Sequence, residues 1–266
     1  MATYVFSDVH GHHRTLERLL ERVSPAAEDT VWILGDMVDR GPDPVSVMRT
    51  CRELANGHIL MGNHEDMMLT AFKNPRDLAA QFSWEMNGGA TTAAGLASLS
   101  NEACLDLVEW ADSLPLGAHV CVDDQQYILV HAGLRPLNFS ARSRWTDVTI
   151  DALLRYQNPE DVLWIRDEFW GQPTGFVNEQ GVGPIVIAGH TPVPYVTDVA
   201  DVYDRPARNE AGECQILHLG ATDATGGVAD RWAIDCGAAG GANWGRIGMV
   251  RLDDGAEFYE AVLEGE

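Results

Sequence analysis

Six side chains suited to binding metal ions follow short apolar segments of this sequence, and none of them is a thiolate. They are Asp8, His10, Asp36, Asn63, His131 and His190. Mixed imidazole, carboxylate and amide donors favour Mn, Fe, Zn or similar divalent ions. Asp8 and His10 stand two positions apart, so both side chains leave an extended segment on the same side. Asp36 is the natural bridge, because one carboxylate can give an oxygen to each of two ions.

A pair of such ions would serve the hydrolysis of phosphoesters. Two divalent ions about 3.5–4 Å apart can clamp a phosphoryl group and lower the pKa of a shared water to near neutrality. The sequence therefore predicts two divalent cofactor ions, with Mn as the first expectation and Fe, Zn, Mg or Ni as alternatives. The hydroxide that bridges the ions is the expected nucleophile.

Strand-like segments precede all of these donors and must position them. They span residues 3–6, 31–34, 59–61, 127–130 and 185–188. Helices are expected over 15–23 and from Pro44, where Asp43 supplies an N-cap and Pro44 the first helical position. Strands that alternate with helices predict an α/β sandwich, in which ligands collect beyond the carboxyl ends of the strands.

The second half of the chain is expected to be rich in strands. Four further strands are predicted at 216–219, 232–234, 247–252 and 258–262, joined by Gly and Asp turns. The segment 134–183 reads as a helical and irregular insertion. No repeat or low-complexity linker divides the sequence, so we expect one domain over residues 1–266. Trp244, in a Gly-rich segment, could edge the site.

Charge and composition narrow the class of protein. Among 266 residues, 40 Asp and Glu outnumber 18 Lys and Arg, which gives a net charge of −22 and disfavours binding to nucleic acid or anionic membranes. No apolar run approaches the ~20 residues of a membrane span. The first residues lack the basic segment of a secretory signal, so a cytoplasmic location is expected. Five scattered Cys without a Cys-x-x-Cys spacing predict reduced thiols.

Five motifs together resemble the calcineurin-like metallophosphoesterases. They are Ser-Asp-Val-His-Gly-His at 7–12, Gly-Asp-Met-Val-Asp-Arg-Gly at 35–41, Gly-Asn-His-Glu at 62–65, His-Ala-Gly at 131–133 and Gly-His-Thr at 189–191. Within that superfamily the chain resembles the phosphoprotein phosphatase family, particularly its short bacterial and phage serine/threonine phosphatases. The segment Ile-Asp-Cys-Gly at 234–237 is similar to a further loop of the family. The resemblance implies a β-sandwich of two mixed sheets flanked by helices.

The resemblance also implies how the metal donors divide. Asp8, His10 and Asp36 would hold the first ion. The second ion would be held by Asp36, Asn63, His131 and His190, with Asp36 shared between the two.

Proton transfer and phosphate binding are implied for further residues. His64, held by Asp39, would protonate the leaving alkoxide, because an imidazole beside a carboxylate is fixed in orientation and kept protonated. Arg40 would bind phosphate oxygens through its planar fork, together with Asn63. A second phosphate-binding arginine is usual in the family. Arg166 matches its location, with Arg135 as the alternative.

The resemblance leaves the substrate open between two enzyme classes. The first reading is a phosphatase of phosphoserine and phosphothreonine in proteins, extending to phosphotyrosine and small phosphomonoesters. The alternative is a hydrolase of diadenosine tetraphosphate, since those bacterial enzymes also resemble this chain. They often lack the acid that stands here as Asp39, and they carry Asp where this chain has Glu65. These two residues and Thr191 favour the protein-phosphatase branch.

Two other readings are disfavoured. Cyclic-nucleotide phosphodiesterases and nucleases of the wider superfamily end in Gly-His-x-His, whereas Pro192 stands at the last position here and cannot bind metal. A catalytically silent binding module on the same scaffold would be expected to have lost ligands or the acid, and none is missing from this sequence. The oligomeric state stays undetermined.

Overall fold

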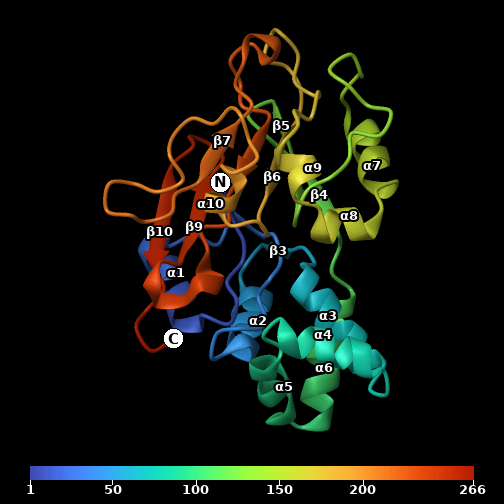
Figure 1. Ribbon diagram of the computed structural model, residues 1–266, viewed down its shortest axis with the longest axis vertical. Helices are drawn as coiled ribbons and strands as arrows, with labels where there is room; N and C mark the ends of the chain where they lie inside the picture. The colour runs from blue at the N-terminus through green and yellow to red at the C-terminus, as the bar shows by residue number, and fades with distance from the viewer.

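The computed structural model describes residues 1–266 and contains two five-stranded mixed sheets (Figure 1). The first sheet has the order β10-β9-β1-β2-β3. Its strands are β1 (Thr3–Phe6), β2 (Thr30–Ile33), β3 (Gly57–Ile59), β9 (Arg246–Arg251) and β10 (Glu257–Ala261). Strands β1, β2 and β3 run parallel, whereas β9 pairs antiparallel with both β1 and β10.

The second sheet has the order β4-β5-β6-β8-β7. Its strands are β4 (Gly117–Val122), β5 (Gln125–Val130), β6 (Ile185–Ala188), β7 (Leu217–Leu219) and β8 (Arg231–Ala233). Its three central strands, β5, β6 and β8, are parallel, and β4 and β7 are antiparallel at the two edges. The expected fold of two mixed sheets is therefore confirmed.

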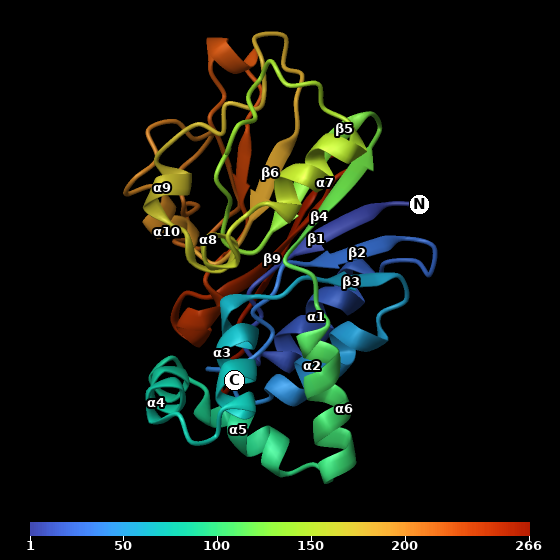
Figure 2. The ribbon, with the colours of Figure 1, turned by 90° about the vertical axis from the view of Figure 1, so that its right-hand side faces the viewer.

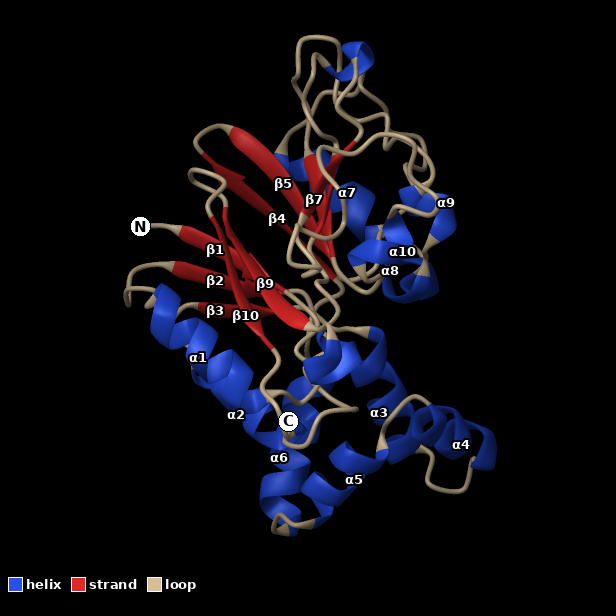
Figure 3. Ribbon diagram, turned by 60° about the vertical axis from the view of Figure 1, so that its left-hand side comes forward, coloured by secondary structure: helices blue, strands red, loops and turns tan.

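Helices cover both sides of the stacked sheets (Figures 2 and 3). The helices associated with the first sheet are α1 (His13–Val23), α2 (Pro44–Glu53), α3 (Asn63–Lys73), α4 (Leu78–Met86), α5 (Ala90–Ala97) and α6 (Asn101–Asp112). The remaining helices are α7 (Asp147–Arg155), α8 (Pro159–Trp164), α9 (Asp167–Trp170) and α10 (Val193–Val196), and α7 packs against β4. None of the helices is long and apolar enough to cross a membrane.

The side chains of β1 show why the first sheet is buried on both faces. Tyr4 and Phe6 belong to a core that includes Leu16 and Leu19 of α1, whereas Val5 belongs to the core between the two sheets. Successive strand residues point to opposite faces, so the run Tyr-Val-Phe at 4–6 packs into two cores at once. This packing fixes β1, and with it the loop that follows β1.

Two parts of the fold differ from expectation. Strand β3 ends at Ile59, and Leu60 and Met61 continue as extended chain towards the site, bonded to Ile33 and Pro115 through their backbone N–H groups. Strand β4 was not expected, because its half-buried sequence lacks a continuous apolar run. Asp123 and Asp124, both at positive φ, join β4 to β5 in a tight hairpin turn. The segment 134–183 holds α7, α8 and α9 between irregular loops.

Candidate active site

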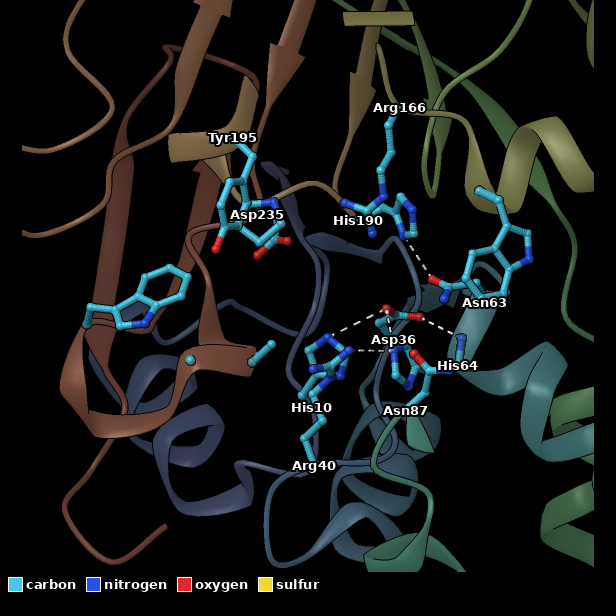
Figure 4. A pocket seen from close by; sticks show the side chains of 15 residues that line it. His10, Asp36, Arg40, Asn63, His64, Asn87, Arg166, His190, Tyr195 and Asp235 are labelled. Carbon is cyan, nitrogen blue, oxygen red and sulfur yellow. Dashed lines mark hydrogen bonds and ion pairs between the residues drawn. The ribbon is translucent and has the colours of Figure 1, made fainter. Parts of the chain in front are cut away.

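The loops after all six parallel strands meet at one place, although they come from two sheets (Figure 4). Asp8 and His10 follow β1, Asp36 follows β2, Asn63 follows β3, His131 follows β5, His190 follows β6 and Asp235 follows β8. Residues that follow five of these strands, all but β5, line a cavity of about 260 Å³. Each sheet thus directs the carboxyl ends of its central strands at the same cavity, which is where open α/β sheets bind ligands.

Asp36 lies between two groups of donors. Its Oδ2 atom is 3.6 Å from His10 Nε2, and Asp8 Oδ1 is 4.0 Å from the same nitrogen. Its Oδ1 atom is 3.4 Å from His131 Nε2. One atom each of Asp36, His131 and His190 lies within 4.8 Å of the others. The two carboxylate oxygens of Asp36 therefore face different donor groups, as the bridging role requires.

The donors around Asn63 fit a cation. His131 Nδ1 donates to the carbonyl oxygen of Leu34 at 2.7 Å, which leaves the lone pair on Nε2. That Nε2 atom faces Asn63 Oδ1 at 2.8 Å, and His190 Nδ1 lies 2.9 Å from the same oxygen. His190 Nε2 is buried and has no hydrogen-bond partner. The lone pair on His131 Nε2 thus faces the lone pairs of Asn63 Oδ1 without a proton between them, and a positive ion would stabilise that arrangement.

The electrostatics of the site also favour bound cations. Burial, together with the nearby Asp235 carboxylate, raises the pKa of Asp8, and burial together with Asp8 and Glu65 raises the pKa of Asp36. Burial lowers the pKa of His131 to about 3 and that of His190 further. These imidazoles are therefore neutral and free to bind metal near pH 7, and bound cations would offset the repulsion among the carboxylates.

Backbone strain is concentrated at the site. Eleven residues other than glycine have positive φ, and six of them are Asp8, His10, Asp36, Asp39, Arg40 and His190. Such conformations cost of order 1–3 kcal/mol each and persist only where the surroundings impose them. Asp36 is held in this way by Glu65, whose buried carboxylate accepts from the N–H groups of Asp36 and Gly62 at 2.8 and 2.9 Å. A Cβ on Gly62 would collide with the Asp36 carboxylate, so glycine is required there.

The predicted proton-transfer pair is also assembled. His64 Nδ1 lies 2.7 Å from Asp39 Oδ2, and both side chains are buried. His64 Nε2 points to the cavity, 3.3 Å from Arg40 Nη2 and 4.0 Å from Asp36 Oδ2. The ring therefore presents one nitrogen to a carboxylate and the other to the place where a phosphoryl group would lie.

Of the three arginines proposed from the sequence to bind phosphate, two line the cavity and one does not. Arg40 and Arg166 line opposite sides of the cavity, with Asp36 between them (Figure 4). Arg135 does not line it, because its guanidinium forms two hydrogen bonds with Asp161, at 2.8 and 2.9 Å. The geometry therefore favours Arg166 over Arg135 as the second phosphate-binding arginine.

Several residues that border the cavity were given no role from the sequence, although Asp235 lies in the segment 234–237 that resembles a loop of the family. Asn87 and Asp235 line it directly, and Trp164 and Tyr195 form an aromatic rim with Trp244, the residue expected at the edge. Trp164 and Tyr195 are 38% and 57% exposed. For Asn87 the sequence offers only the adjacent glycines, which let backbone approach closely, whereas for Asp235 it also offers the family-like segment 234–237.

The sequence matches the family described as "Calcineurin-like phosphoesterase" over residues 1–216. The chain therefore belongs to the calcineurin-like phosphoesterase family. Membership supports the predicted metal-dependent phosphoester hydrolase, and it leaves the branch within the superfamily open.

Curated proteins similar to this chain are named as dinucleoside tetraphosphatases, the alternative function considered from the sequence. A symmetrical bis(5'-nucleosyl)-tetraphosphatase of Dechloromonas aromatica (strain RCB) is 29% identical over 178 residues, which are 66% of this chain and 59% of the relative. One of Nitrosomonas europaea (strain ATCC 19718) is 36% identical over 138 residues, covering 51% of this chain and 46% of the relative. The chain thus matches about half the length of these relatives. Membership of the phosphoprotein phosphatase family is not supported by them.

Solved structures support the fold alone. A candidate diadenosine tetraphosphatase superposes with a TM-score of 0.54 at 18% identity, over 99% of this chain and 95% of that one. A protein serine/threonine phosphatase of Saccharomyces cerevisiae superposes with a TM-score of 0.59 at 12% identity, over 100% of this chain and 81% of that one. Both superpositions agree with the two-sheet fold described above.

Proposed function

We propose that the protein is a metal-dependent hydrolase of dinucleoside polyphosphates, with bis(5'-nucleosyl) tetraphosphates as its first substrates. The observation that carries the hydrolase assignment is the Asp36 carboxylate between two donor groups, in a cavity with Arg40 and Arg166 on opposite sides. The substrate class is supported by the names of the curated relatives. Two arginines facing one cavity suit a ligand with several phosphates.

The proposed cofactor is a pair of divalent ions, Mn²⁺ first, because the donors are nitrogen and oxygen atoms. Asp8, His10 and Asp36 would hold one ion. The other would be held by Asp36, Asn63, His131 and His190. When bound, such ions polarise the phosphoryl oxygens and lower the pKa of a water between them.

The protein's own side chains would then act at two points of the substrate. Arg40 and Arg166 would bind phosphate oxygens from opposite sides of the cavity and so hold the phosphoryl group between them. His64 gives the proton on Nε2 to the leaving oxygen, while its Nδ1–H bond to Asp39 holds the ring in place. The nearby Arg40 guanidinium places the same phosphoryl group beside His64.

The aromatic rim suits the nucleoside parts of such a substrate. Trp164, Tyr195 and Trp244 border the cavity and are at least partly exposed. Aromatic side chains stack on bases with about 1–3 kcal/mol per base and little sequence preference. A phosphorylated serine has no ring to stack, so the rim favours the nucleotide reading.

One observation favours the second candidate, a phosphatase of phosphoserine and phosphothreonine. The buried Asp39 bonds to His64 Nδ1 and so fixes the ring with Nε2 towards the cavity, and an alkoxide leaving group requires a proton donor positioned in this way. A nucleoside polyphosphate leaves as a stable anion, since phosphate has a second pKa of about 6, and it depends less on such a donor.

A direct comparison of substrates distinguishes the two candidate functions. We would measure kcat/KM for bis(5'-adenosyl) tetraphosphate, for a phosphoserine peptide and for para-nitrophenyl phosphate on one Mn²⁺-loaded preparation. A value at least about tenfold higher for the tetraphosphate is expected, which corresponds to about 1.4 kcal/mol of transition-state binding. A preference for the phosphopeptide would favour the second candidate. Absence of metal-dependent activity on all three would contradict both.

A further inference from the structure

The Asp39 carboxylate has two donors besides His64, and neither belongs to the cavity lining. Trp84 of α4 directs its Nε1–H at both oxygens, 3.0 Å from Oδ1 and 3.1 Å from Oδ2. The Thr92 hydroxyl of α5 donates to Oδ1 at 2.6 Å, and the hydroxyl oxygen itself accepts from the backbone N–H of Asp39 at 2.9 Å. Asp39 is fully buried, so these side chains replace the water that a carboxylate would otherwise bind.

The arrangement of these donors decides which carboxylate oxygen His64 meets. Thr92 occupies Oδ1 and Trp84 bridges both oxygens, so the remaining lone pair of Oδ2 is directed at His64 Nδ1. Without these bonds the carboxylate could rotate about its Cβ–Cγ bond, which is a broad torsion for aspartate. The ring of His64 would lose a fixed partner, and its Nε2 atom would lose a fixed direction.

A tight turn between α4 and α5 brings the two donors to Asp39. Gly88 has a φ of +101°, and its carbonyl oxygen accepts from the backbone N–H of Arg40 at 3.0 Å. A Cβ on Gly89 would lie 2.6 Å from the Trp84 indole, so only glycine lets the turn close over that ring. The turn is therefore bonded to the loop that carries Asp39 and Arg40, and it holds Trp84 and Thr92 on one side of it.

We propose that Trp84 and Thr92 are positioning residues for proton transfer, which fix the Asp39 carboxylate so that His64 presents Nε2 to the leaving oxygen. The inference rests on the proposed function, since it assigns a purpose to a pair that protonates a leaving group. The inference adds two residues, 45 and 53 positions from Asp39 in sequence, to those that position the proton donor.

Leaving-group dependence tests this role. The variants are Trp84→Phe, which removes the indole N–H and keeps a smaller aromatic ring, and Thr92→Val, which removes the hydroxyl at nearly constant volume. The substrates are phenyl phosphate and 2,4-dinitrophenyl phosphate. Phenolate, from a phenol of pKa about 10, needs a proton as it leaves, whereas the much more acidic dinitrophenol does not. We expect kcat for phenyl phosphate to fall about 10- to 100-fold in both variants with KM little changed, and kcat for the dinitrophenyl ester to change less than about threefold.

Matched controls and a second readout complete the test. Trp110→Phe on α6 and Thr70→Val on α3 make the same changes without touching Asp39 and should leave both substrates unaffected. Thr92→Ser restores the hydroxyl and should restore kcat. In proton NMR of the protein, the bonded Nδ1–H of His64, assigned by its loss in His64→Asn, should shift in Trp84→Phe and Thr92→Val and stay unchanged in the controls.

The outcomes distinguish this inference from the proposed function. Equal losses on the two esters, or loss of bound Mn²⁺ from the variants, would show a merely structural role and overturn the inference while the wild-type protein remains an active hydrolase. A wild-type protein without metal-dependent activity on either ester would overturn the proposed function, and the inference with it.

Discussion

The backbone N–H of His190 donates to the carboxylate of Asp8 at 3.0 Å, although 182 residues separate the two in sequence. Asp8 follows a strand of the first sheet and His190 a strand of the second. Gly189 allows this approach, because a Cβ there would collide with Asp8. The donors contributed by the two sheets are thus bonded to each other directly, and the candidate metal site exists only when both sheets are packed together.

Replacing His64 by Asn tests the proton donor. Loss of a general acid should lower kcat for phenyl phosphate by about 10²–10⁴-fold. Bound metal should be unchanged, because His64 Nδ1 is engaged with Asp39 and the proposed donor sets do not include this ring. Steady-state kinetics and elemental analysis of the same sample measure both. If the metal is lost together with the activity, His64 is a ligand and its proposed role is wrong.

Replacing Asp36 by Asn tests whether this carboxylate is shared by two metal ions. Both donor groups contain this carboxylate, so the variant should retain almost no tightly bound Mn²⁺ after gel filtration, whereas the wild type should retain about two ions per chain. Asp39→Asn makes the same chemical change three positions away and should keep its metal, since its carboxylate faces Trp84 and Thr92. Retention of one full equivalent by Asp36→Asn would contradict the shared ligand.

The sequence predicts the candidate metal donors of this site better than it predicts the residues that hold Asp39 in place. Asp8, Asp36 and His131 stand one to three residues after apolar strands, and the rule that ligands collect at strand ends needs only this local pattern. Trp84 and Thr92 could not be found in this way. Neither residue type indicates proton transfer by itself, and their contact with Asp39 depends on how α4 and α5 pack.

The substrate was the least predictable feature, for a reason that Glu65 illustrates. This residue favoured the protein-phosphatase branch in the sequence, yet its carboxylate bonds to the backbone N–H groups of Asp36, Met37 and Gly62 and does not line the cavity. It shapes the loop that carries the candidate metal donor Asp36 and has no atom in the cavity lining. A difference at this position therefore reports on loop geometry, and it says little about which phosphoester is cleaved.

The reactivity of the cysteine thiols tests how the protein core is packed. Burial raises the pKa of the Cys51, Cys214 and Cys236 thiols, which keeps them in the unreactive protonated form at pH 8. Cys121 is exposed. Brief treatment of the native protein with iodoacetamide should therefore label Cys121 first, and peptide mass spectrometry should find the three buried thiols labelled only after unfolding. Early labelling of Cys236 would show that the loop after β8 is open in solution.

Removing the ring of Tyr195 tests the aromatic rim. Tyr195 is 57% exposed at the edge of the cavity, so Tyr195→Ala should leave the metal site and the fold unchanged. If the ring stacks on a base, its loss should raise KM for bis(5'-adenosyl) tetraphosphate by about fivefold or more, the equivalent of ~1 kcal/mol, the low end of base stacking. KM for para-nitrophenyl phosphate, which has no nucleoside, should stay within about twofold. Tyr203→Ala, at an exposed tyrosine outside the cavity lining, is the matched control. Equal effects of Tyr195→Ala on both substrates would mean that the rim does not recognise the base.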